Sequence, residues 1–283
     1  MPVAQNKGVR LHWDETGSGT PVLLIMGQLY SSRMWYPLLP ALAAKHRAIY
    51  FDNRGTGDSD TTPSATIGDL ADDALAVLDA AGAKRAHVYG VSMGGGIAAE
   101  FAMRYPDRVS SLVLGCTMMK TAVAPGPRGL ARLIYYLPQG LVRAVMRGRM
   151  SPEAYGSAAP PAAVAKDMEV LASDRFTMRG VRVQAEAIAK YATTREAVGR
   201  LAMPTLVLHG DEDQAVDVKH GREFAAAIPH SRLVIFEGAG HNYLVAAPET
   251  STAALLDFLE EVDRDPGARP GSGESASPSA ASD

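Results

Sequence analysis

Six short apolar runs, separated by amphipathic segments, constrain the fold of this chain more than any other feature. The runs occupy residues 22–26, 47–51, 86–91, 111–116, 205–210 and 232–237. Runs this short and this apolar are typical of strands buried on both faces of a sheet. Helical patterns lie between them, as in 66–83, where Thr66 and Asp69 form a capping motif before an apolar periodicity. The alternation predicts an α/β fold with a mostly parallel, doubly wound sheet.

The alternation is interrupted once and stops before the end of the chain. Helical patterns follow one another without a convincing strand over 118–203, which predicts an inserted helical cap. The core domain is then made of residues 1–117 and 204–263. Residues 264–283 are only Pro, Gly, Ala, Ser and charged residues, so we expect a disordered tail there. Residues 8–26, with a Gly-Ser-Gly turn, suit an antiparallel hairpin at one edge of the sheet.

Composition excludes several classes of function. The 283 residues are 47% hydrophobic and carry a net charge of −3, which gives no general attraction to nucleic acid or to anionic membranes. Cys116 is the single cysteine and cannot form an internal disulfide, and no apolar run has the length of a membrane span. The first residues have no secretion-signal pattern. We therefore expect a cytoplasmic protein, and nothing in the sequence specifies an oligomeric state.

The glycine-rich segment "VYGVSMGGG", residues 88–96, directly follows an apolar run. A phosphate-binding loop would need a lysine after its glycines, and the dinucleotide motif would need glycine where Ser92 stands. Gly90-Val-Ser92-Met-Gly94 instead fits Gly-x-Ser-x-Gly, in which a tight strand-to-helix turn presents a serine nucleophile. The flanking glycines permit this strained turn. Ser92 is therefore the candidate nucleophile.

A serine needs a histidine base and a carboxylate that orients the base. His241 follows the run 232–237 through the turn Gly238–Gly240, and we interpret it as the base. Asp213, after the run 205–210, is the candidate acid, with Asp211 in reserve. Residues at the carboxyl ends of parallel strands share one crevice, so these side chains can meet Ser92 there.

With these motifs the chain resembles the α/β-hydrolase superfamily. The resemblance covers roughly 8–120 and 198–262 and rests on "GVSMGG", "GDEDQAV", "GAGH" and "FDNRGTGDSD" in that family's pattern. It implies an oxyanion hole made by the backbone N–H groups of Met93 and Gln28. Met26-Gly27 stands where relatives commonly carry His-Gly before this donor. A structural role is implied for the turn formed by Asp52, Arg54, Gly55, Gly57 and Ser59.

The implied activity is that of a serine hydrolase without cofactor or metal. Its substrate would be a small-molecule ester, lactone or thioester, cleaved through an acyl-enzyme. The motifs are similar to those of esterases, enol-lactonases and cofactor-free haloperoxidases. Three alternatives stay open: hydrolysis of a C–C bond in a diketone by the same residues, haloperoxidase-like activity, and a non-catalytic binding protein.

The cap leaves the substrate open. Between Arg108 and Ser151 there is no acidic residue, and the cations there are Lys120, Arg128, Arg132, Arg143, Arg147 and Arg149. One hypothesis is that an arginine binds a carboxylate or a CoA phosphate, and the alternative is a solvated helix face. A second open question is which bulky side chains line the substrate pocket and which pack in the core. It concerns Trp35 and the cap residues Tyr135, Tyr136, Met146, Met150 and Met168. The Gln28 side chain faces either substrate or solvent.

Overall fold

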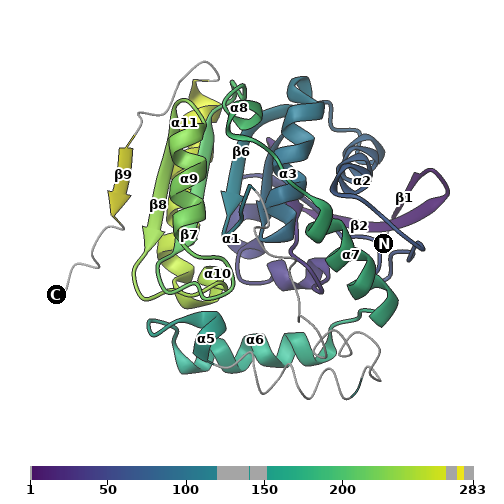
Figure 1. Ribbon diagram of the computed structural model, residues 1–283, viewed down its shortest axis with the longest axis horizontal. Coiled ribbons are helices and arrows are strands. Elements are labelled where there is room, and N and C mark those ends of the chain that lie inside the picture. The colour runs from purple at the N-terminus through teal and green to yellow at the C-terminus, as the bar shows by residue number, and fades with distance from the viewer. Residues whose placement is uncertain (1, 120–139, 141–151, 266–272, 277–283) are drawn as a thin grey trace.

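The computed structural model describes residues 2–119, 140, 152–265 and 273–276, and within them a nine-stranded sheet forms the centre (Figure 1). Its strand order is β1-β2-β4-β3-β5-β6-β7-β8-β9. The strands are β1 (Val3–Asn6), β2 (Val9–Thr16), β3 (Pro21–Ile25), β4 (Arg47–Phe51), β5 (Ala86–Val91), β6 (Val109–Gly115), β7 (Thr205–Gly210), β8 (Ser231–Phe236) and β9 (Gly273–Ala276). The pairs β1–β2 and β2–β4 are antiparallel and the others are parallel. The predicted α/β class is confirmed.

The central strands follow the six apolar runs closely. Every residue of β5 and of β7 is buried, as expected for strands covered on both faces by helices. The edge hairpin differs from the prediction. It joins β1 to β2, while β3 lies on the far side of β4, between β4 and β5. β3 is almost wholly buried and β2 alternates between buried and exposed positions, so the interior place belongs to β3.

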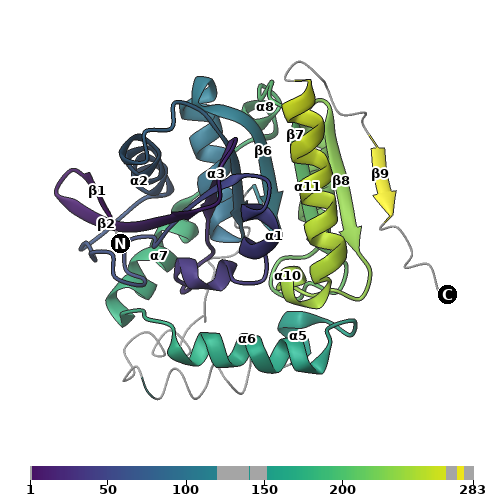
Figure 2. The same ribbon diagram turned by 180° about the vertical axis from the view of Figure 1, so that it is seen from behind.

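Helices cover both faces of the sheet. One face packs against α2 (Ile67–Ala80), α3 (Met93–Arg104) and α9 (Lys219–Ala227), and the other against α1 (Leu39–Ala43) and α11 (Pro248–Arg264) (Figures 1 and 2). No helix of the described residues is long and apolar enough to cross a membrane.

Two predictions about individual residues have a clear outcome in these layers. Thr66 and Asp69 form the predicted capping box at the start of α2. The backbone N–H of each residue donates a hydrogen bond to the side chain of the other. Trp35, in the short 3₁₀ helix Ser32–Trp35, is completely buried against Tyr89, with ring centroids 5.1 Å apart. Trp35 therefore belongs to the core and does not line a pocket.

The described part of the segment between β6 and β7 consists of helices without a strand. These are α5 (Pro152–Tyr155), α6 (Pro161–Ser173), α7 (Met178–Lys190) and α8 (Arg195–Val198). Helices α5 and α6 lie across the end of the sheet toward which β6 and β8 point (Figures 1 and 2). This is the end at which the loops with Ser92, Asp213 and His241 leave their strands.

The last part of the chain differs from the predicted disordered tail. Helix α11 continues to Arg264, and Gly273–Ala276 pairs in parallel with β8 as strand β9. An edge strand offers unpaired backbone N–H and C=O groups, and such pairing requires no apolar side chain. A composition that cannot build a core can therefore still extend a sheet. The rest of the tail, 266–272 and 277–283, lies outside the described residues.

Candidate active site

Ser92 lies at the junction of β5 and α3 in a strained conformation, with φ 55° and ψ −122°. A non-glycine residue at positive φ is held there only by its surroundings. A Cβ at Gly90 would collide with the carbonyl of Gly94, and a Cβ at Gly94 would collide with the carbonyl of Ile25. The two glycines of the Gly-x-Ser-x-Gly pattern are therefore required by close backbone packing around Ser92.

Ser92, His241 and Asp213 form one hydrogen-bonded series. His241 Nε2 lies 3.0 Å from Ser92 Oγ, and His241 Nδ1 lies 2.7 Å from Asp213 Oδ2. The structure thus brings together the three side chains from loops after β5, β7 and β8. Asp211, the reserve acid, instead accepts a hydrogen bond from the Gly238 backbone N–H at 2.7 Å. It braces the turn before His241.

The surroundings of Asp213 stabilise its charged form. Its Oδ1 accepts hydrogen bonds from the backbone N–H groups of Ala215 and Val216, each at 2.8 Å. His209 Nε2 lies between Asp213 Oδ2 at 3.3 Å and the Val216 carbonyl at 2.8 Å; both partners are acceptors, so this nitrogen carries the hydrogen. Burial opposes ionisation, but the bonds from His209 and His241 outweigh it and lower the pKa of Asp213 well below its usual range.

His241 is shifted in the opposite direction. Burial disfavours the charged imidazole, but the neighbouring Cys116 and Asp213 outweigh that effect and raise the pKa of His241 well above its ordinary value of 6.5. A histidine in these surroundings holds a proton strongly. The adjacent carboxylate of Asp213 orients the imidazole and increases its basicity.

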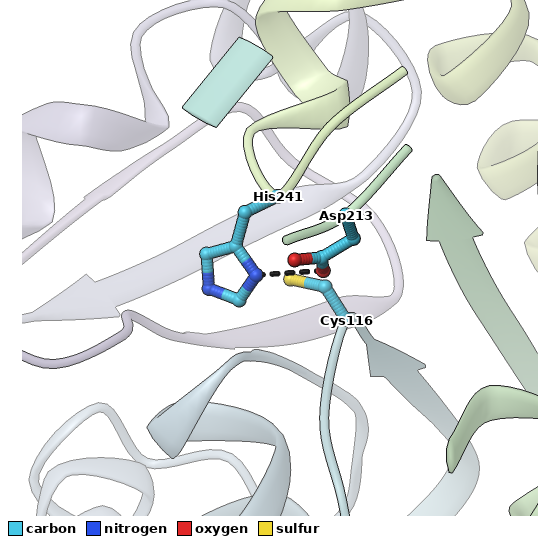
Figure 3. Close-up of side chains that lie close together, drawn as sticks. All are labelled: Cys116, Asp213 and His241. Atoms are coloured by element: carbon cyan, nitrogen blue, oxygen red, sulfur yellow. Dashed lines mark hydrogen bonds and ion pairs between the residues drawn. The ribbon is translucent and has the colours of Figure 1, made fainter. Parts of the chain in front are cut away.

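Cys116 completes a compact cluster with Asp213 and His241, in which the potential ligand atoms lie within 4.8 Å of one another (Figure 3). Cys116 follows β6, is buried, and has a positive φ of 39°. Sequence reasoning considered it only as a disulfide candidate. A cation at this point would have to replace the proton between His241 Nδ1 and Asp213 Oδ2, which are already at hydrogen-bonding distance. The arrangement suits a carboxylate-oriented imidazole better than a metal centre.

The residues predicted to supply the oxyanion donors lie close to Ser92. Met93 follows it directly, and a Cβ at Gly27 would be 3.2 Å from Ser92 Cβ, so the Gly27–Gln28 segment lies against the serine. Gln28 Nε2 donates to the Val181 carbonyl of α7 at 3.3 Å. The side chain of Gln28 therefore contacts α7, and Gln28 also lines the cavity next to Ser92.

The loop with His241 is bound to residues of the inserted segment. The backbone N–H groups of Gly240 and Asn242 donate to the carbonyls of Tyr155 and Ala154 at 2.7 and 2.8 Å. The Asn242 side chain donates to Asp167 Oδ2 on α6 at 2.9 Å. Burial raises the pKa of Asp167, although hydrogen bonds from the side chains of Tyr155, Tyr36 and Asn242 oppose this shift. These contacts depend on long-range packing and had no local sequence signal.

A cavity of about 310 Å³ opens next to Ser92 and His241. Its lining is largely apolar, with Met26, Met34, Ile67, Val91, Ile188 and Leu244 among the contributors. Met168 is not part of this lining. The cap candidates Lys120, Arg128, Arg132, Tyr135, Tyr136, Arg143, Met146, Arg147, Arg149 and Met150 lie outside the described residues.

Comparison with known proteins finds relatives that match most of this chain. The family model for the alpha/beta hydrolase fold matches residues 20–248. A relative from Azorhizobium caulinodans, provisionally named carbamate hydrolase RutD, is 31% identical over 93% of this chain and 100% of its own length. A thermophilic esterase from Thermogutta terrifontis superposes with a TM-score of 0.78 and 28% identity, covering 92% of this chain and 97% of its own. An enol-lactonase from Burkholderia xenovorans LB400 has a TM-score of 0.80 and 25% identity, covering 92% and 100%.

Proposed function

Because the chain belongs to the α/β-hydrolase family, we propose that it is a serine hydrolase that cleaves a carboxylic ester, lactone or thioester through an acyl-enzyme. One observation carries the proposal. The series Ser92–His241–Asp213, with separations of 3.0 and 2.7 Å, ends at a cavity that admits a small molecule. The names of the similar esterase and enol-lactonase support an ester or a lactone as the substrate of this chain.

The mechanism begins with attack of Ser92 Oγ on the substrate carbonyl carbon, while His241 Nε2 takes the hydroxyl proton. Asp213 keeps the other imidazole hydrogen on Nδ1 and stabilises the imidazolium that forms. The imidazolium then gives its proton to the leaving alcohol or thiol as the C–O or C–S bond breaks. Water attacks the acyl-enzyme, His241 takes the water proton, and the acid leaves as the proton returns to Ser92.

The negative charge that develops on the carbonyl oxygen is stabilised by the backbone N–H groups of Gln28 and Met93. Among the hydrogen bonds of the described residues, neither N–H has a partner within the protein. Both residues line the cavity next to Ser92, which supports this assignment. Each such donor contributes about 2.7–4 kcal/mol to transition-state stabilisation. No step of this mechanism requires a cofactor or a metal.

The division of the chain into core and cap belongs to the same proposal. Residues 1–117 and 204–263 form the core that holds Ser92, Asp213 and His241, and residues 118–203 form the cap. Two contributions of the cap support this assignment. Ala154, Ile188 and Tyr191 line the cavity, and the hydrogen bonds of Ala154 and Tyr155 hold the loop with His241.

The test is a substrate panel for the wild type and Ser92→Ala. It contains p-nitrophenyl esters, a lactone, an acyl-CoA, a carbamate, a vinylogous diketone, and bromide with hydrogen peroxide. We expect turnover of at least one ester, lactone or thioester and a loss of kcat of about 10⁶-fold in Ser92→Ala. Turnover of the diketone alone, or of bromide and peroxide alone, would favour the corresponding alternative reaction. A folded wild type without any turnover would favour a binding protein.

A further inference from the structure

The backbone on either side of Gln28 is held by two buried side-chain amides. Asn53 Nδ2 donates to the Met26 carbonyl at 2.8 Å, and Gln184 Oε1 accepts from the Leu29 backbone N–H at 3.0 Å. Neither Asn53 nor Gln184 is exposed to solvent. Fixing the carbonyl before Gly27 and the N–H after Gln28 leaves the peptide between them little freedom to rotate. That peptide carries the proposed Gln28 donor.

Leu29 needs such a restraint because its backbone is strained. Its φ is 77°, a left-handed value that residues other than glycine rarely adopt. Strain of this kind costs about 1–3 kcal/mol and persists only where the surroundings enforce it. The bond from Leu29 N–H to Gln184 is a contact of that type. Without it, the loop is free to relax toward an ordinary conformation and to turn the Gln28 N–H away from Ser92.

Gln184 is itself fixed against the core. Its Nε2 donates to the Arg54 carbonyl at 3.0 Å, and Arg54 forms a buried bidentate ion pair with Asp73 at 2.6 and 2.7 Å. One turn earlier on α7, a Cβ at Gly180 would collide with the backbone of Gly55. Residues four apart lie on the same helix face, so this close packing places Gln184 on the core side of α7.

From these contacts we infer that Gln184, on cap helix α7, is a positioning residue for the oxyanion hole. It holds Leu29 and thereby aims the Gln28 N–H at the carbonyl oxygen bonded by Met93 N–H in the transition state. The cap thus takes part in the chemistry through the geometry of a core loop, besides lining the cavity. The inference rests on the proposed function, because Gln28 is a donor only if Ser92 attacks a carbonyl.

The experiment compares the wild type with Gln184→Met, which has a similar shape without the amide. Gln184→Asn keeps the amide but is one methylene shorter, so it cannot reach both Leu29 and Arg54. Val183→Ala is the matched control, because Val183 is buried on the same helix next to Gln184 and is not among the residues that line the cavity. For each protein, kcat and KM are measured on the best ester, with Ki for a trifluoromethyl ketone of the same acyl chain and the melting temperature.

Removal of an oxyanion donor costs about 10²–10³-fold in kcat, and a misaimed donor retains part of its effect, so we expect a loss of about 10–100-fold in both Gln184 variants. KM should change by less than about threefold, because the contact acts in the transition state. The Ki of the ketone, whose adduct carries the same oxyanion, should rise by the factor by which kcat/KM falls. Val183→Ala should lower the melting temperature and leave kcat unchanged.

A wild-type kcat and Ki in both Gln184 variants would overturn the inference, as would a loss confined to KM. An equal loss of kcat in Val183→Ala would also overturn it, by assigning Gln184 a purely structural role. If Gln184→Met does not fold, Gln184→Asn decides the question by the same readouts. Failure of the proposed function has a different signature, since the wild type would then show neither ester turnover nor formation of the ketone adduct.

Discussion

Replacement of Asp213 by asparagine removes a charge without changing the shape of the side chain. Asp213 Oδ1 accepts two backbone N–H groups, and Oδ2 faces His241 Nδ1 at 2.7 Å. The amide oxygen of asparagine is needed by the two backbone donors, so the NH₂ group must face His241. Nδ1 then becomes an acceptor and the imidazole hydrogen moves to Nε2. An Nε2 that carries hydrogen cannot take the proton of Ser92.

The size of the effect follows from this geometry. A carboxylate and an imidazolium with charges about 4 Å apart attract by about 4 kcal/mol at an effective dielectric constant of about 20. Loss of that stabilisation in the transition state lowers the rate by about 10³-fold. The wrong tautomer adds to it, and an asparagine in this position of a serine triad lowers kcat by about 10⁴-fold. From these two values we expect kcat of Asp213→Asn to be lower than that of the wild type by about 10³–10⁴-fold.

Asp211→Asn is the matched control, because Asp211 lies two residues away and bonds Gly238 without contacting His241. Its kcat should fall by less than about tenfold, since the asparagine oxygen can still accept the Gly238 N–H and this one hydrogen bond loses only its charge. Both variants are assayed for kcat on the best ester, and their folding is checked by circular dichroism. The reasoning is refuted if Asp213→Asn keeps kcat within tenfold of the wild type or if Asp211→Asn is the more damaged of the two.

Three further predictions follow from single contacts. Because His241 must be neutral to accept the Ser92 proton and its pKa is raised, kcat/KM should fall as pH decreases through a value above 6.5; a limb centred at or below 6.5 would contradict this. In Gly94→Ala the new Cβ meets the Ile25 carbonyl, so the unfolding free energy in urea should drop by about 3 kcal/mol, whereas an unchanged midpoint would argue against the close packing. Arg54→Met leaves the buried Asp73 carboxyl without its ion-pair partner, with only the Asn6 amide bonded to it among the described residues, and should cost about 3–5 kcal/mol by the same measurement, a loss under 1 kcal/mol being the contrary result.

The fold was largely predictable because its signals are local. Strands such as β5 and β7 are buried along their whole length, so their apolar runs mark them within one or two residues. The capping residues of α2 are likewise adjacent in the chain. The order of strands at the edge was not predictable in this way. A glycine-rich turn after β2 indicates a change of direction but does not say whether β3 pairs with β2 or with β4.

The residues of the candidate site likewise fall into a group that the sequence could predict and a group that it could not. Ser92, Asp213 and His241 stand in short motifs at strand ends, so their meeting could be predicted from the topology of a parallel sheet. Gln184 bonds a backbone group 155 residues away, and no motif on α7 distinguishes it from a solvated glutamine. The position of Cys116 beside His241 likewise depends on how β6 and β8 place their ends. Such contacts are fixed by tertiary packing.

The central claim is that Ser92 is a nucleophile activated by His241, and a fluorophosphonate probe tests it most directly. The probe phosphonylates an activated serine, and intact-protein mass spectrometry followed by peptide mapping locates the adduct. We predict one adduct per chain on Ser92 in the wild type, none in Ser92→Ala, and much slower labelling in His241→Gln. A folded wild type that takes up no probe, or takes it up at another residue, would contradict the account.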